Sequence, residues 1–535
     1  MARTTGNASD LITFTRASTG TALTKVAYGP ELVTNGGFDD ATGWTLGAGW
    51  AVSTGTLNWS GGYNRAAFPV GAGAFEAGKA YQVTGTISNY TSGRVNAYIA
   101  LSGNPLNVIV AVPQANGDFS LLLLPTATVN EFGFVGNDAS GARSIDNISV
   151  REVLYNDPTG TLKLISHPTN KPRVEYDANG VAKGLLIEEA RTNLVTYSED
   201  FSNWNQTINL SISLNSDVVS PFNEPVTKLT EDNANSSRYI QSPFMTVNTS
   251  TRYTYSIFAK AAERDKFQML LGQSTAWGSP TSVSFDLTLG EVISIGSGTA
   301  NVTASIQDYG NGWYRCIMSA DRNSTVASAF AYVFLLDSSG NVTYQGDNTS
   351  GIYIWGAQFE QGSFPTSYIP TSGATATRSA DIASVSVSEF GYNQAQGTVV
   401  VEANPILSGS PIGLQGIVEF NNGTTNDQIT IINENNDRLR IIIDPTSAAN
   451  DVDFTISGAE GSEKYAAAWA TNDVQAAHGG LLGAGDTSSN PPATITTLTI
   501  GNDAGSSIPL NGHIKSINYY PLRLSDAKLQ ELTSS

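Results

Sequence analysis

The chain holds few histidines and cysteines, residues that enzymes often use for proton transfer and nucleophilic attack. It contains three histidines and one cysteine: His167, His478, His513 and Cys316. We find no Gly-x-Ser-x-Gly, no His-Glu-x-x-His and no paired cysteines, so neither a hydrolase nucleophile nor a zinc site is indicated. A glycosidase needs two carboxylates that face each other, whereas the adjacent Glu188 and Glu189 would point to opposite faces of a strand. We therefore interpret both as structural and predict a protein without enzymatic activity.

Aromatic side chains offer a different chemistry. Exposed rings stack on the C–H faces of sugars, while neighbouring amides and carboxylates bind the hydroxyl groups. Trp44 and Trp204 occupy equivalent positions of a weak internal repeat, which indicates core packing. Trp277 lies in a stretch of small and polar residues that is typical of a loop tip. The predicted glycan-contacting residues are Trp50, Trp59, Tyr63 and Trp277.

Composition and charge exclude several classes of partner. The 535 residues include 28 Lys or Arg and 47 Asp or Glu, which gives a net charge of −19. This sign repels phosphate backbones and anionic membranes, so we expect no nucleic-acid partner and no membrane insertion. A single cysteine allows no intrachain disulfide, which favours assembly in a reducing cytoplasm. We see no secretory signal, and the longest apolar run is too short to cross a bilayer.

The elements that must position these residues are strands. Residues 81–87, 253–258 and 494–500 alternate apolar and polar side chains and end at Gly, Asn or Pro, which is typical of half-buried strands. One helix is predicted near the C-terminus, at 525–532, with Ser525 as its N-cap. The repeat between residues 31–44 and 193–204 predicts two related sandwiches, and a third domain follows a Pro/Ser/Thr-rich linker.

Five segments together resemble a family of virion-surface proteins of tailed phages, the tail-fibre and related fibre proteins. They are DLITFTRAST at 10–19, PRVEY at 172–176, GLLIEEARTNL at 184–194, WGAQFE at 355–360 and TSYIPT at 366–371. The resemblance covers about residues 10–25 and 160–385. The first two segments normally lie close together, whereas here a sandwich separates them. We infer that this sandwich is inserted into an N-terminal docking module, whose two arms would lie side by side.

Two weaker resemblances concern the outer domains. LVTNGGF at 32–38 and IDNISV at 145–150 resemble a carbohydrate-binding-module jelly roll. Such jelly rolls often carry a structural Ca²⁺ near the first and last strands, and the matching positions here are Glu31, Asp39 and Asp146, although acidic turn residues are more often simply solvated. No other cofactor is expected. LTIGN at 498–502 and LRLSD at 522–526 resemble a concanavalin A/laminin-G-like sandwich.

The predicted fold is therefore all-β, with three consecutive β-sandwich (jelly-roll) domains and a small docking module. The predicted boundaries are 1–28 and 155–192 for the two arms of the module, and 29–154, 193–371 and 372–535 for the sandwiches. The residues predicted to contact the rest of the virion are Leu11, Phe14, Arg16 and Arg191.

The sequence as a whole predicts a non-enzymatic structural protein on a tailed-phage virion that attaches to host-surface glycans. Its expected partners are other virion proteins and further copies of itself, for instance as a trimer, because sandwich edges are unpaired and the surface carries little charge. We expect assembly in the bacterial host cytoplasm. Two alternatives remain open: a capsid decoration or head-fibre protein with mainly structural contacts, and a glycan-active enzyme with accessory modules.

Overall fold

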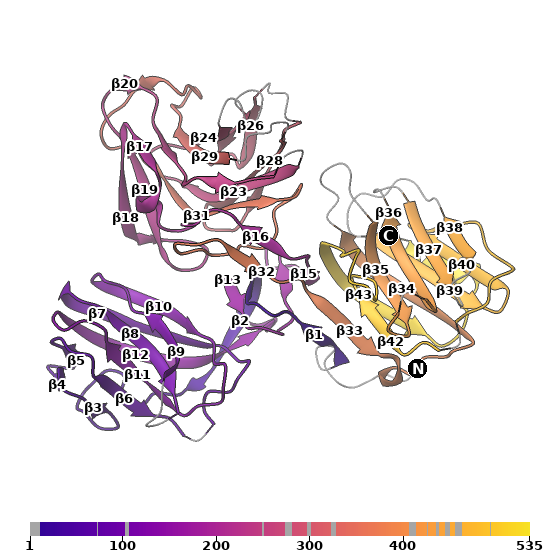
Figure 1. The fold of residues 1–535 in the computed structure, drawn as a ribbon, viewed down its shortest axis with the longest axis horizontal. Coiled ribbons are helices and arrows are strands. Elements are labelled where there is room, and N and C mark those ends of the chain that lie inside the picture. The colour runs from indigo at the N-terminus through magenta and orange to yellow at the C-terminus, as the bar shows by residue number, and fades with distance from the viewer. Residues whose placement is uncertain are drawn as a thin grey trace. The chain divides into compact units, whose positions relative to one another are not determined.

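The fold is all-β, as the alternating sequence patterns predict. A computed structural model of the chain describes residues 11–534 except 72, 102–105, 249–250, 273–280, 297–300, 323–327, 406–413, 425, 435–437, 445–449, 455–462 and 493. Its antiparallel sheets group into three sandwiches (Figure 1). Two compact units can be separated: Leu23–Thr169 with Leu214–Val226 form one, and the remaining residues form the other. No helix within the described ranges has the length and apolar character needed to span a bilayer.

The first sandwich consists of two sheets around one apolar core. The larger sheet is formed by β2 (Gly20–Glu31), β4 (Trp50–Ser53), β5 (Thr56–Trp59), β7 (Tyr81–Ser92), β10 (Gly117–Leu123), β12 (Ala142–Tyr155) and β13 (Thr161–His167). The smaller sheet is formed by β3 (Thr45–Leu46), β6 (Arg65–Pro69), β8 (Val95–Ala100), β9 (Leu106–Ala111) and β11 (Glu131–Gly136). The strand orders are β10-β7-β12-β2-β13 and β3-β6-β11-β8-β9, and the β4–β5 hairpin pairs with β12 through β5.

The second sandwich places two broad sheets face to face. One contains β17 (Gln206–Ile208), β21 (Tyr239–Gln241), β22 (Met245–Thr246), β24 (Lys266–Gly272), β25 (Thr281–Asp286), β26 (Glu291–Ile295) and β29 (Ser328–Leu335). The other contains β18 (Leu210–Val219), β19 (Pro225–Glu231), β23 (Arg252–Ala261), β27 (Thr303–Asp308), β28 (Trp313–Asp321) and β31 (Gly351–Gln361). The orders are β17-β21-β29-β24-β25-β26 and β18-β19-β31-β23-β28-β27. A short ladder joins β20 (Asn235–Ser236) to β30 (Tyr344–Gln345), and η1 (Phe201–Asn203) is a 3-10 turn.

The third sandwich has two sheets of seven described strands each. The first contains β1 (Thr13–Thr15), β33 (Ile382–Ser386), β35 (Leu414–Asn421), β36 (Gln428–Glu434), β37 (Arg438–Asp444), β38 (Asn450–Phe454) and β42 (Thr497–Ile500). The second contains β14 (Val174–Tyr176), β15 (Ala182–Ile187), β34 (Gln396–Pro405), β39 (Glu463–Ala470), β40 (Asp473–His478), β41 (Leu481–Leu482) and β43 (Gly512–Tyr520). Their orders are β1-β33-β42-β35-β36-β37-β38 and β14-β15-β43-β34-β39-β40-β41. The turn η2 (Val387–Glu389) follows β33.

Two smaller elements complete the fold. β16 (Arg191–Asn193) pairs with β32 (Ala376–Arg378). The helix predicted at the C-terminus is present as α2 (Asp526–Thr533), with Ser525 at its N-cap. Leu529 of α2 is fully buried against small residues of β39 and β40, so the helix closes the outer face of the second sheet.

The two arms of the predicted docking module contribute strands to larger sheets. β1, β14 and β15 extend the sheets of the third sandwich, while β2 and β13 are neighbours in the first sandwich. Pairing at a sheet edge satisfies the backbone groups that a short isolated strand would leave open. Within the described residues the arms therefore do not build a sheet of their own.

The internal repeat corresponds to equivalent core contacts. Phe38 and Trp44 of the first sandwich lie 5.1 Å apart between ring centroids, and Phe201 and Trp204 of the second lie 4.9 Å apart. Both tryptophans are buried, which confirms that Trp44 and Trp204 are core residues.

Candidate functional site

The second sandwich carries a row of aromatic side chains on the outer face of one sheet. We call Phe244, Phe330, Tyr332, Phe334 and Tyr239 the aromatic row. Three of them come from β29, one from β21, and Phe244 from the segment between β21 and β22. Phe244 is 54% exposed, and the other four are half-buried.

The alternation of β29 places the rings outside the core. Ala329, Ala331 and Val333 are fully buried in the sandwich core. Because successive side chains of a strand point to opposite faces, the aromatic residues that alternate with them lie on the other face. The small residues thus pack inside the sandwich, and the large ones line the surface of the sheet.

The rings form a continuous series. Phe330 lies 5.8 Å from Phe244 and 6.5 Å from Tyr332 between ring centroids. Tyr332 lies 6.0 Å from Phe334, and Tyr239 lies 4.7 Å from Phe334. The two separations within β29 match the two-residue repeat of a strand, on the order of 7 Å, whereas Tyr239 and Phe244 contact these rings from the neighbouring β21 and the segment after it. The row therefore offers several neighbouring faces rather than one isolated ring.

Uncharged polar side chains flank the row on both sides. Tyr332 is paired across strands with Gln241 of β21, and Phe334 with Gln268 of β24. Gln268 Nε2 donates a hydrogen bond to Ser284 Oγ of β25, at 3.2 Å. Gln241 and Ser284 are buried, and Gln268 is half-buried and accessible. An amide of this kind binds sugar hydroxyls without requiring a charge on the ligand.

Gly272 makes room for the ring of Tyr332. A Cβ atom at this position would lie 2.7 Å from a ring carbon of Tyr332, closer than packed carbon atoms approach. A larger residue at 272 would therefore displace the ring. Burial, followed by the proximity of Tyr239, raises the pKa of Tyr332, so its hydroxyl stays protonated at neutral pH and can donate a hydrogen bond.

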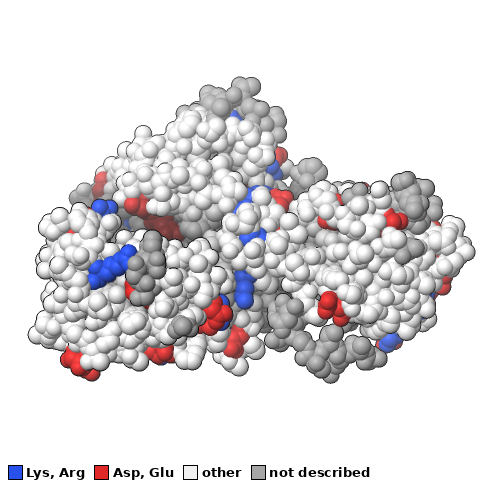
Figure 2. Space-filling view, turned by 60° about the horizontal axis from the view of Figure 1, so that its bottom comes forward, with Lys and Arg blue, Asp and Glu red and all other residues white. Residues whose placement is uncertain are grey.

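Charge is nearly absent from this sheet. Its described strands contain three charged residues, Lys266, Asp286 and Glu291, all beyond the Phe334 end of the row. Lys266 Nζ lies 2.7 Å from Asp286, so these two charges offset each other. The face of the molecule shown in Figure 2 is likewise formed mostly by uncharged residues.

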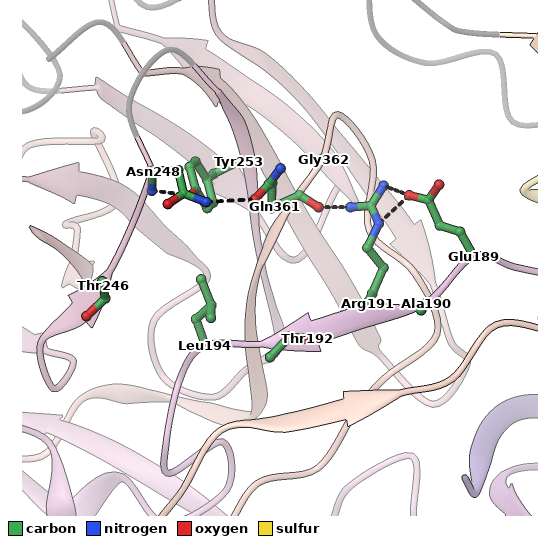
Figure 3. Close-up of a pocket in the computed structure, with 10 residues that line it drawn as sticks. All are labelled: Glu189, Ala190, Arg191, Thr192, Leu194, Thr246, Asn248, Tyr253, Gln361 and Gly362. Atoms are coloured by element: carbon green, nitrogen blue, oxygen red, sulfur yellow. Dashed lines mark hydrogen bonds and ion pairs between the residues drawn. The ribbon is translucent and has the colours of Figure 1, made fainter. Parts of the chain in front are cut away.

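A polar cavity of about 560 Å³ is the second candidate. It is lined by Glu189, Ala190, Arg191, Thr192, Leu194, Thr246, Asn248, Tyr253, Gln361 and Gly362. Figure 3 shows the Arg191 guanidinium between the Glu189 carboxylate and the backbone oxygen of Gln361. The side-chain Nδ2 of Asn248 donates a hydrogen bond to Gln361 Oε1 at 3.5 Å. The backbone N–H of Asn248 donates to the Tyr253 hydroxyl at 2.7 Å. Since these groups bind one another, the cavity is a weaker candidate than the aromatic row.

The prediction that Trp50 and Trp59 contact a glycan is wrong. The β4–β5 hairpin sets them opposite each other, and they are 6% and 1% exposed. Trp50 Nε1 donates to the Asn64 carbonyl oxygen at 2.8 Å, so its polar edge is also satisfied within the chain. Tyr63 is 65% exposed. Trp277 lies outside the described residues.

The predicted calcium ligands are not assembled. The Glu31 carboxylate accepts hydrogen bonds from the Ser149 hydroxyl and from Arg151 Nε, the latter at 3.1 Å. Burial raises the pKa of Glu31, but these and further hydrogen bonds outweigh it and lower the pKa overall. In the part of the chain that the structure describes, no three His, Cys, Asp or Glu side chains converge as a metal site. Glu31, Asp39 and Asp146 therefore do not form the expected trio.

The predicted docking residues lie largely inside the protein. Phe14 of β1 is buried in the core of the third sandwich, and Leu11 packs against the same core. The Arg16 side chain has no exposed surface. The docking prediction is therefore wrong for Phe14 and Arg16, because the chain itself encloses them. Arg191 lines the cavity and is held by Glu189.

Arg16 belongs to a buried group of charges that we call the arginine–carboxylate cluster. It consists of Arg16, Arg173, Glu188, Arg378 and Asp381, each with at most 3% of its side chain exposed. Arg16 Nη1 lies 3.1 Å from Asp381 Oδ1, and Arg173 bridges Asp381 and Glu188. Three distant segments of the sequence are thereby tied together.

Glu188 shows why this cluster is stable. Burial alone would raise its pKa, but Arg378, Arg173 and hydrogen bonds from Ser367 lower the pKa to about 2. Both the amide and the hydroxyl of Ser367 donate to Glu188, each at 2.7 Å. A buried charge needs such complete pairing. The interpretation of Glu188 as a structural residue is confirmed.

The three histidines lie in separate surroundings. His167 lies against Tyr155, His478 against Tyr465, and His513 against Glu175. They do not meet in one cluster of titratable groups within the described residues. Burial also raises the pKa of Cys316, which disfavours a reactive thiolate.

The aromatic row was not predicted from the sequence, where tryptophans were the more obvious candidates for sugar contact. The available signal was the segment 328–335, in which alternate positions hold small and large apolar residues. When both faces of a strand are apolar but one face carries only small side chains, the small side chains can fill the core and the large ones can lie on the outer face.

Comparisons with known proteins give only distant likenesses. No family model and no curated protein matches the chain. The CBM40 of a Ruminococcus gnavus IT-sialidase, solved with alpha2,3 sialyllactose, has a TM-score of 0.24 and 18% identity, and covers 27% of this chain and 84% of its own. The CBM22-1–CBM22-2 tandem of Paenibacillus barcinonensis Xyn10C has a TM-score of 0.20, 11% identity and coverages of 62% and 98%. A Trypanosoma rangeli sialidase has a TM-score of 0.24, 12% identity and coverages of 89% and 82%. At such TM-scores these likenesses carry no argument about the fold or function of the chain.

Proposed function

We propose that this protein is a non-enzymatic glycan-binding protein and that the aromatic row is its contact surface. The observation that carries the proposal is the row itself, with five neighbouring rings on one sheet face and amides and hydroxyls beside them. Aromatic rings supply large apolar area for the C–H faces of sugars, and the flanking polar groups supply orientation.

Charge supports a sugar over a nucleic acid. Single-stranded nucleic acids also stack on aromatic rows, but the proteins that bind them add a positively charged groove for the backbone. The described strands of this sheet contain one cation, Lys266, and it is paired with Asp286. A net charge of −19 opposes phosphate further.

We further propose that the protein is displayed on the surface of a tailed-phage virion. The proposal is supported by the sequence segments that resemble phage fibre proteins. Several of their residues, among them Arg16, Arg173 and Glu188, meet in the arginine–carboxylate cluster, so the segments of the motif come together in one place of this chain. Repeated copies on a particle would raise the avidity of individually weak sugar sites.

A glycan array of the full-length protein tests the binding proposal. We expect selective binding that is lost in the double variant Tyr332→Ala/Phe334→Ala and retained in Tyr63→Ala. Tyr63 is the matched control, because it is a strongly exposed aromatic residue of another sandwich. Circular dichroism must show that all three proteins are folded. Binding that survives the double variant would contradict the proposed site.

Localisation on purified particles tests the virion proposal. We expect cryo-electron microscopy and antibody labelling to place the protein on the particle surface. Density at the tail would favour a role in attachment, and density on the capsid would favour decoration. Absence from particles would contradict the proposal, and turnover of a polysaccharide by the purified protein would contradict the non-enzymatic part.

A further inference from the structure

We propose that the aromatic row binds an uncharged, unbranched glycan chain lengthwise, through several consecutive sugar units, rather than a single terminal sugar. This inference rests on the proposed function and specifies the class of ligand. It follows from the extent of the row, from the placement of its polar neighbours and from the distribution of charge.

The extent of the row favours a chain. Phe330, Tyr332 and Phe334 follow one another along β29. Tyr239, the cross-strand partner of Phe334, and Phe244, edge-on to Phe330, widen the row beside its two ends. Consecutive centroids along β29 are 6.5 and 6.0 Å apart, a spacing of the order of one sugar ring. A terminal sugar would cover one or two of these rings and leave the others exposed to water, which is unfavourable for apolar surface.

The orientations of the rings also fit an extended ligand. The planes of Phe330 and Tyr332 differ by 59°, and those of Tyr332 and Phe334 by 32°. Successive faces therefore turn along the strand, as they must if each is to meet a different unit of a twisting chain. A single flat ligand could lie against only one of them.

Polar groups accompany the row on both sides rather than closing one end. On the β21 side stands Gln241, which is itself paired with Gln206 of β17. On the β24 side stand Gln268 and, one strand further, Ser284. Gln241 and Ser284 are buried, so the half-buried Gln268 is the amide among them that a bound chain can reach. It lies beside the row, whereas recognition of a chain end requires groups that enclose that end.

The charge distribution favours a neutral chain. The three charged residues of the described strands, Lys266, Asp286 and Glu291, carry a net charge of −1 and lie beyond one end of the row. Lys266 is engaged by Asp286 at 2.7 Å. No unpaired cation thus lies among the described strands of this sheet to hold the carboxylate of a uronic or sialic acid, and such a group would meet a weak repulsion.

Affinity as a function of chain length tests the inference. Calorimetric titrations would use malto-, cello-, xylo- and chito-oligosaccharides of two to six units, with hyaluronan and polysialic acid as charged polymers. In at least one neutral series we expect Kd to fall by about tenfold or more between two and five units, which is the gain from about 1.4 kcal/mol of added contact. Neither charged polymer should bind more tightly than the best neutral chain.

Variants at the centre and at the end of the row sharpen this test. Tyr332→Ala should weaken the binding of short and long oligosaccharides alike. Phe244→Ala should weaken only the longer ones, because Phe244 lies at the exposed end of the row. Tyr63→Ala is the control and should change neither, and thermal unfolding confirms that each variant is folded.

The outcomes separate this inference from the proposed function. Array binding to a terminal, branched or charged glycan through Tyr332, without any dependence on chain length, would overturn the inference and leave the proposed function standing. Absence of any glycan binding by the wild-type protein would overturn both. If the row variants instead change the sedimentation coefficient, a second copy of the chain covers the row, and the inference is overturned.

Discussion

The first and second sandwiches both gather aromatic rings, but on opposite sides of their sheets. In the first, Trp50 and Trp59 face each other across the β4–β5 hairpin and lie in the core. In the second, Phe330, Tyr332 and Phe334 of β29 lie on the outer face, while the small residues between them fill the core. The position of an aromatic residue relative to the core, rather than its type, thus determines whether it can meet a ligand.

The largest expected effect on stability concerns Trp59, one of the buried rings of the first sandwich. Trp59→Ala should lower the free energy of unfolding by about 3–5 kcal/mol, because it empties a large space in the core. The ring is closely enclosed, since a Cβ atom added at Gly93 or Gly136 would lie 2.7 or 2.5 Å from it. Chemical denaturation of the full-length protein measures the effect, with Tyr63→Ala as control. A loss below about 1 kcal/mol would contradict the assignment of Trp59 to the core.

The contrast also explains what the sequence could reveal. The alternating strands, the C-terminal helix and the core positions of Trp44 and Trp204 follow from local patterns and from the repeat. The burial of Trp50 and Trp59 does not, since β4 and β5 have four residues each, too few for alternation to establish which face is buried. In β29 both faces are apolar, so alternation alone could not indicate the exposed face.

The arginine–carboxylate cluster was hidden for a different reason. Arg16 and Asp381 are 365 positions apart in the chain, and the local sequence around either residue does not indicate that the two form an ion pair. The motif around Arg16 was visible, and it led to the prediction of a docking residue because the resemblance places this segment in a docking module. Only the pairing of strands from three segments shows that the charge is internal.

A second prediction compares this ionic interior with the apolar core of the first sandwich. The pKa of Glu188 is about 2 in the folded chain against an ordinary 4.5. Its charge therefore stabilises the fold above about pH 4.5, and this contribution, on the order of 3 kcal/mol, is lost as the pH falls towards 2. Thermal unfolding between pH 6 and pH 2.5 should show this decline.

The variant Glu188→Gln isolates that effect. It should be destabilised at pH 6, because the buried arginines lose part of their counter-charge, and its stability should decline less on acidification than that of the wild type. Trp59→Ala, which changes no titratable group, should keep the wild-type pH dependence. Equal acid sensitivity of the wild type and Glu188→Gln would contradict the role of the cluster.

A third prediction concerns the aromatic row. Phe334→Ala should lower the free energy of unfolding by only about 1 kcal/mol, because the ring is half-buried and lies outside the core, yet it should reduce glycan binding by about tenfold. Parallel denaturation and titration experiments measure the two effects on the same sample. A loss of stability as large as that of Trp59→Ala, without a change in binding, would place Phe334 among the structural rings.

The smallest effect is expected at Tyr63, the most exposed of the large apolar side chains in the described part of the chain apart from Leu214 and Leu289. Tyr63→Ala should change the free energy of unfolding by no more than about 0.5 kcal/mol, as is usual for surface substitutions. Binding should also stay unchanged, because no aromatic contact joins Tyr63 to a second ring among the described residues. A single exposed ring supplies one stacking face, whereas the aromatic row supplies several. This variant therefore tests whether exposure of one ring is enough for glycan binding or whether several neighbouring rings are needed. Reduced glycan binding by Tyr63→Ala would move the site to the first sandwich and reverse the comparison between the two domains.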